Sequence, residues 1–131
     1  MRVIVLLAVG VLAAGIATVA AGADVSTGAT GNPRFRATLR ADGHVVKAGT
    51  PWRFVVRSWN LANRPIPGTA IVRVRRSGRI VDTVGWFGFK RGVVQRTYRW
   101  SKTLRGRYAL LEAKVIGPGG TRTLAYRVRI T

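Results

Sequence analysis

Cysteine is absent from this chain of 131 residues, and acidic residues are almost as scarce. Without cysteine there is no disulfide, no thiol nucleophile and no cysteine metal ligand, so apolar burial must stabilise the fold. Four carboxylates and one histidine are spread along the sequence, whereas acid–base catalysis needs positioned titratable groups and a metal ion needs several clustered ligands. The sequence therefore predicts a non-enzymatic protein with no catalytic residue, cofactor, metal site or small-molecule substrate. The four carboxylates and the histidine are Asp24, Asp42, Asp82, Glu112 and His44.

Positive charge is what the chain has in excess. Lysine and arginine number 23 against 4 acidic residues, which gives a net charge of +19. Such a charge attracts polyanions of any kind but does not determine a fold. The expected partners are anionic envelope polymers or lipid head groups, with a protein partner as a further option. A GC-rich coding sequence also produces arginine in excess, so selection for binding and coding bias both remain open.

The first 23 residues have the features of a targeting segment. Arg2 precedes an apolar stretch that reaches Ile16, and a small-x-small motif, Ala21-Gly22-Ala23, stands before Asp24. This pattern predicts a secretory signal peptide. The alternative is an uncleaved anchor, because residues 3–23 as a helix would be about 31 Å long, enough to span a bilayer. Either way the protein is expected to be secreted or extracytoplasmic, and residues 24–33, "DVSTGATGNP", are expected to be a flexible linker.

From residue 34 onward apolar and polar residues alternate with period two, and Gly, Pro and Asn interrupt the pattern every eight to twelve residues. This spacing is typical of an antiparallel β-sandwich. We predict an all-β domain over residues 34–131 with seven strands, and a tight turn at "RSGR" between the third and the fourth. The strands are expected at residues 34–40, 52–59, 69–76, 80–86, 93–100, 107–116 and 121–130.

The parity of each strand predicts which side chains form the core. Trp52 and Trp100 are expected to point inward, and so is Tyr126. The sixth strand has a parity conflict, because Tyr108 and Leu110 alternate on one face whereas Leu111, Ala113 and Val115 alternate on the other. A β-bulge near residues 110 and 111 is therefore expected.

Seven strands in about 100 residues is the size of an immunoglobulin-like sandwich. "LRADGHVVKAGTPWRFVV", "RPIPGTAIVRV" and "TLAYRVRI" resemble small secreted immunoglobulin-like domains of high-GC bacteria. "LRGRYAL" is similar to the glycine-x-tyrosine motif before their sixth strand. The resemblance implies a single β-sandwich after a leader, with no assigned activity and with the Tyr108 hydroxyl capping nearby backbone. The chain departs from antibody domains because it lacks the inter-sheet cysteine pair and a clear tryptophan in the third strand.

The alternating arginines form the first candidate site. If the third, sixth and seventh strands share one sheet and the first, second and fifth the other, both outer faces are basic. Arginine on every second position is also the ordinary solvent side of a half-buried strand, so binding and simple solvation both remain open. Glu112 is expected to pair with one of its arginine neighbours. The candidate binding residues of the first sheet are Arg73, Arg75, Arg127 and Arg129, with Lys114 beside them.

The second candidate site is "GWFGFKRG", residues 85–92, which is expected to be a glycine-bounded loop. Exposed aromatic side chains beside cations suit a membrane interface, a glycan or a protein partner. The alternative is that Trp86 and one phenylalanine close the end of the core. Its candidate binding residues are Trp86, Phe87, Phe89, Lys90 and Arg91. The sequence thus favours an exported, envelope-associated binding or structural module, and a secreted polyanion binder for glycan, envelope polymer or nucleic acid is the alternative.

Overall fold

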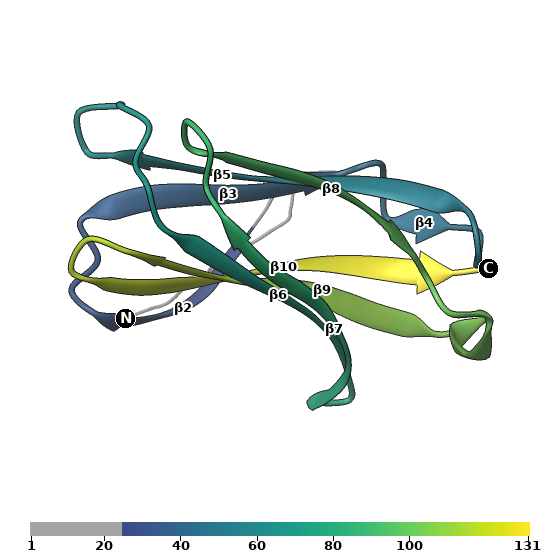
Figure 1. Ribbon diagram of the computed structural model, residues 1–131. Helices are drawn as coiled ribbons and strands as arrows, with labels where there is room; N and C mark the ends of the chain where they lie inside the picture. Colours follow the sequence, from purple (N-terminus) through teal and green to yellow (C-terminus); the bar gives the residue numbers. More distant parts are fainter. Residues whose placement is uncertain (1–24) are drawn as a thin grey trace, which may run out of the picture.

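Two facing β-sheets make up the computed structural model, which describes residues 25–131 (Figure 1). The larger sheet has the strand order β2-β10-β9-β6-β7, and β4 pairs in parallel with the end of β10. The smaller sheet has the order β3-β5-β8. All other pairings are antiparallel. The predicted leader, residues 1–23, lies outside the described residues.

The strands of the larger sheet are β2 (Val25–Gly31), β4 (Val45–Val46), β6 (Thr69–Arg76), β7 (Arg79–Gly88), β9 (Tyr108–Gly117) and β10 (Gly120–Ile130). Those of the smaller sheet are β3 (Phe35–Ala41), β5 (Pro51–Asn60) and β8 (Val93–Arg99). A single turn of 3-10 helix, Lys102–Leu104, connects the two sheets between β8 and β9. Across residues 25–131 the structure has no helix that is long and apolar enough to cross a membrane.

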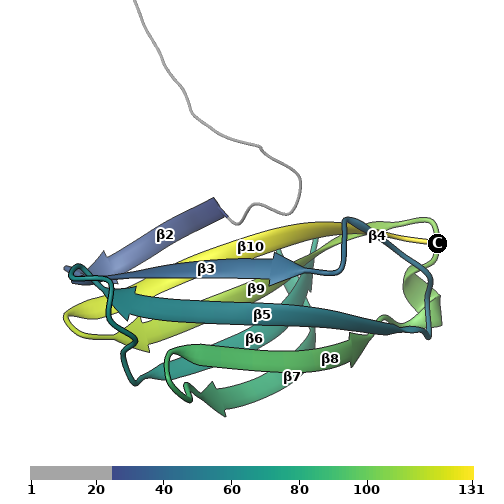
Figure 2. The same cartoon turned by 90° about the horizontal axis from the view of Figure 1, so that it is seen from above.

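All seven predicted strands are present, with ends that differ from the prediction by two residues at most. The predicted division into sheets is also confirmed, because β6, β9 and β10 share the larger sheet while β3, β5 and β8 form the smaller one. Viewed from above, the smaller sheet lies across the larger one as a second layer (Figure 2). The all-β, two-sheet prediction is therefore correct.

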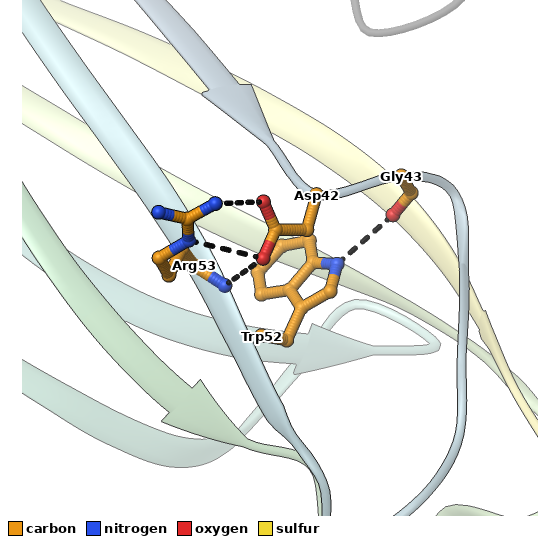
Figure 3. Close-up of polar contacts among 4 residues, drawn as sticks. All are labelled: Asp42, Gly43, Trp52 and Arg53. Atoms are coloured by element: carbon orange, nitrogen blue, oxygen red, sulfur yellow. Dashed lines mark hydrogen bonds and ion pairs between the residues drawn. The ribbon is translucent and has the colours of Figure 1, made fainter.

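The core lies between the two sheets and is built from the inward residues of each strand. Trp52 on β5 is 2% exposed, and its ring lies 5.4 Å from that of Trp100 and 5.8 Å from that of Tyr126. The Trp52 indole Nε1 donates to the Gly43 carbonyl at 3.0 Å, so its polar atom is satisfied (Figure 3). Burying an apolar side chain of this kind contributes about 1.5 to 3 kcal/mol. The inward parity predicted for Trp52, Trp100 and Tyr126 is confirmed.

The bulge expected near residues 110 and 111 is not present. The register between β9 and β10 runs without a shift from Tyr108 to Gly117, and Ala109 and Leu111 are both buried. The parity conflict disappears because Tyr108 and Leu110 lie on the outer face, where they are 52% and 37% exposed. The sequence reasoning assumed that large apolar side chains point inward, and here two of them do not.

The expected linker also needs correction, because Val25–Gly31 forms strand β2. This strand pairs antiparallel with residues Gly120 to Ala125 of β10. Strand pairing uses backbone groups, so a segment of small residues can extend a sheet even though its side chains give no alternating pattern. The small side chains of this segment predicted a linker. Its backbone pairs with the free edge of β10, and this pairing makes it a strand.

The β6–β7 hairpin closes through a two-residue turn at Ser77 and Gly78. Both residues have positive φ, 52° and 77°, as a type I′ turn requires. The predicted tight turn at "RSGR" is confirmed. Two register shifts interrupt the ladder below it, between Val72 and Arg73 and between Val74 and Arg75.

Candidate functional site

The outer face of the larger sheet gathers the first set of predicted site residues. Inward residues alternate with outward ones along each strand, so Arg73 and Arg75 of β6 lie beside Glu112 and Leu110 of β9. Leu110 in turn pairs with Arg127 of β10. The register therefore brings together basic residues that are separated by about 50 positions in the sequence. The cations of this face are Arg73, Arg75, Lys114, Arg127 and Arg129.

Glu112 is the one acidic residue on these central strands, and it is paired. The Arg75 Nε donates to the Glu112 Oε2 at 2.8 Å, and the two side chains are 31% and 18% exposed. This confirms the predicted pairing of Glu112 with an arginine. The only other ion pair among residues 25–131 joins Arg53 to Asp42. Arg73, Arg127 and Arg129 therefore have no carboxylate partner within that range.

An aromatic ring lies among these cations. The guanidinium of Arg127 lies 4.2 Å from the centre of the Tyr108 ring, which is a cation–π contact. Beside this pair is a shallow pocket of about 440 Å³, between the β6–β7 turn and the start of β9. Tyr108 does not take the role that the resemblance implies, because none of the described residues accepts or donates a hydrogen bond at its hydroxyl.

Trp86 also lies on this face. It pairs with Ile71 of β6, which in turn pairs with Lys114 of β9. These three side chains form one cross-strand row on this face. The Trp86 side chain is 67% exposed. Trp86 is therefore exposed, and the alternative that it closes the end of the core is wrong for this residue.

The rest of "GWFGFKRG" is arranged differently from the prediction. The first four of these residues belong to β7, so the segment is a strand end followed by a turn and not a loop. Phe87 and Phe89 pack against the core, and the Arg96 guanidinium lies 4.7 Å from the Phe87 ring centre. Lys90 and Arg91 lie in the turn to β8. A strand places alternate side chains on opposite faces, so the aromatic residues cannot form one cluster.

The outer face of the smaller sheet also carries cations, but its strands have no large exposed apolar side chain. Arg53 of this face donates from its Nε to the Asp42 carboxylate at 3.4 Å, and its backbone N–H donates to the same carboxylate at 3.0 Å (Figure 3). Trp59 and Val55 are only partly exposed. The five cations of this face are Arg36, Arg40, Arg53, Arg57 and Arg99.

The other titratable residues make contacts that maintain the fold. His44 stacks on Tyr126 with ring centres 4.1 Å apart, and its Nδ1 donates to the Arg127 carbonyl at 2.6 Å. The Tyr98 hydroxyl donates to Asp82 at 2.5 Å, and burial together with this carboxylate raises the pKa of Tyr98. No three His, Cys, Asp or Glu residues of the described chain are grouped closely enough to hold a metal ion.

The sequence reasoning missed Tyr108 and Leu110 as members of the outer face, and Arg76 as a residue that lines its pocket. Strict alternation in "YALLEAKV" would have found the first two, because inward Leu111 and Ala113 require outward Leu110 and Tyr108. Arg76 has no such signal, since it reaches the pocket only through the geometry of the turn. No protein-family model matches this sequence, and a comparison with curated proteins gives no match.

Proposed function

We propose that this chain is an exported, non-enzymatic immunoglobulin-like domain that binds anionic polymers of the cell envelope through the outer face of its larger sheet. The strand order supports the immunoglobulin-like assignment. Immunoglobulin sandwiches place strands A, B and E in one sheet and C, F and G in the other. The orders β3-β5-β8 and β10-β9-β6 correspond to A-B-E and G-F-C.

Export is supported by the first 23 residues, where one arginine precedes an apolar stretch and a small-x-small motif. Without the leader, 22 basic residues stand against 4 acidic ones, a net charge of +18. A domain with this charge outside the membrane attracts the anionic polymers of the envelope electrostatically.

One observation carries the proposed binding role. On the outer face of the larger sheet, five cations share the surface with one carboxylate that Arg75 already neutralises, and exposed aromatic rings lie on the same face. Cations attract an anionic polymer from a distance, and exposed rings add contacts that salt does not screen. The smaller sheet has the cations without the large exposed apolar side chains.

Binding to dextran sulfate, a polyanion without aromatic groups, tests the proposal. Replacing Arg127 and Arg129 with serine removes two cations from the larger sheet's outer face. At about 1 kcal/mol per cation near an anionic surface, the affinity at low salt falls about thirtyfold. Replacing Arg36 and Arg57 with serine removes the same charge from the smaller sheet and weakens binding much less. Equal losses would assign binding to the overall charge and overturn the role of this face.

A further inference from the structure

The pocket beside Tyr108 is distinct from the rest of the basic face in shape and composition. Its volume of about 440 Å³ falls in the range of small-molecule sites. Three kinds of group meet there: guanidinium groups, an apolar wall and the backbone of a tight turn. They come from Arg75, Arg76 and Arg127, from Tyr108 and Leu110, and from Ser77 with Gly78.

Two of the three cations of the pocket, Arg75 and Arg127, are held in place by contacts within the protein. Arg75 donates from Nε to Glu112 at 2.8 Å and from Nη1 to the Gly78 carbonyl at 3.3 Å. Arg127 lies over the Tyr108 ring at 4.2 Å. Because an ordered guanidinium loses little conformational entropy on binding, these contacts prepare the pocket for an anion. No carboxylate is among the residues that line it.

The geometry of Arg127 favours a planar anion. The Arg127 Cζ lies over the Tyr108 ring, and the N–H groups of a guanidinium point outward in the plane of the group. A carboxylate matches this edge with two parallel hydrogen bonds. Tyr108 is 52% exposed and Leu110 is 37% exposed. They offer an apolar surface to the rest of a ligand whose carboxylate binds Arg127.

We propose that this pocket binds one carboxylate-bearing sugar ring of an acidic glycan. The carboxylate contacts Arg127 and Arg76, the C–H groups of the ring lie against Tyr108 and Leu110, and the sugar hydroxyls meet the polar groups of the Ser77–Gly78 turn. This assignment rests on the proposed function, because it names the class of envelope polymer that the outer face binds.

Trigalacturonate is the probe, and its binding is followed by the amide NMR shifts of Ser77 and Gly78. Loss of the charged contact in Arg127→Gln weakens binding about tenfold. Arg36→Gln removes the same charge from the opposite face and changes the affinity less than about twofold. Both arginines are exposed, and circular dichroism checks that each variant keeps its β structure. Trigalacturonate methyl ester, which has the same rings without charge, does not bind.

Tripolyphosphate separates a sugar carboxylate from any compact anion, because it carries charge without a ring. It is expected to bind weakly and without preference for wild type over Arg127→Gln. Equal affinity for tripolyphosphate and trigalacturonate, or equal losses in Arg127→Gln and Arg36→Gln, would overturn the proposal. If dextran sulfate still binds in either case, the proposed function stands and only the pocket assignment fails. If wild type binds no polyanion at low salt, the proposed function itself fails.

Discussion

The outer faces of the two sheets carry the same number of cations but differ in their apolar side chains. Each has five lysines or arginines on its strands and one ion pair with a carboxylate. Of the eight large apolar side chains that are exposed in the described chain, six lie on β7 and β9 of the larger sheet, and none lies on β3, β5 or β8. Charge is therefore a property of both sheets, whereas the large exposed apolar side chains that lie on strands belong to the larger sheet alone.

This difference has a thermodynamic meaning. Each Å² of apolar surface left in water forgoes about 25 cal/mol of favourable burial, so a cluster of exposed rings and aliphatic side chains gains free energy when a partner covers it. An exposed arginine gains no comparable free energy from being covered, because water already solvates its guanidinium well. Exposure of aromatic and aliphatic side chains, rather than arginine density, therefore distinguishes the face on which we place binding.

The largest expected effect separates the core from both outer faces. Trp52→Ala removes a side chain that touches Trp100 and Tyr126, and it should lower the free energy of unfolding by about 3 to 5 kcal/mol. A domain without disulfides and with ordinary stability would lose much of its folded population. Urea denaturation followed by circular dichroism measures the change.

Trp86→Ala is the matched control, because it removes the same side chain from an exposed position. Its effect on the free energy of unfolding should stay within about 0.5 kcal/mol. A loss as large as that of Trp52→Ala would mean that Trp86 supports the core, and the contrast between the two outer faces would disappear.

The ion pairs of the two faces should differ in strength. Glu112→Gln leaves the partly buried Arg75 without its charged acceptor and should lower the free energy of unfolding by about 1.5 kcal/mol. Asp42→Asn breaks the more exposed pair with Arg53, whose side chains are 62% and 41% accessible, and should cost less than about 0.5 kcal/mol. Thermal denaturation at two salt concentrations checks both values. The reverse order would show that burial does not set the strength of these pairs.

A smaller effect concerns the contact that joins the edges of the two sheets. Tyr98 of β8 donates to Asp82 of β7, and Tyr98→Phe should cost about 1 kcal/mol by removing this hydrogen bond. Burial and Asp82 raise the pKa of Tyr98 above its ordinary value of 10.0. The unfolded chain therefore ionises first, so stability is complete below pH 10 and falls as the pH rises above it.

Denaturation between pH 8 and 11 tests this dependence. The loss of stability at high pH should be smaller in Tyr98→Phe than in wild type, although not absent, because burial also raises the pKa of Tyr126. If wild type and the variant lose stability in parallel, Tyr98 is not the group that titrates, and the contact between the two sheet edges is weaker than its geometry indicates.

The fold was largely predictable because its strands are half-buried. In "WRFVVR" an outward arginine follows an inward tryptophan, so the pattern marks both the strand and its orientation. Strand β2 was not predictable, since its pairing with β10 depends on backbone hydrogen bonds that small side chains do not encode. In the candidate site, Arg73 and Arg127 were predictable as outward residues, but Tyr108 was misjudged because its size argued for burial.

By itself the sequence determined the all-β class, the seven main strands, their inward residues and a charge that is basic on every outward surface. Those properties depend on local alternation and composition, which a chain carries whatever its topology. Only the tertiary structure decided which distant residues meet: the register of β6, β9 and β10 brought Arg75, Leu110 and Arg127 into one row, and the β6–β7 turn closed a pocket beside them. Register is set by the packing of whole strands, and a shift of one residue would have turned every one of these side chains to the opposite face.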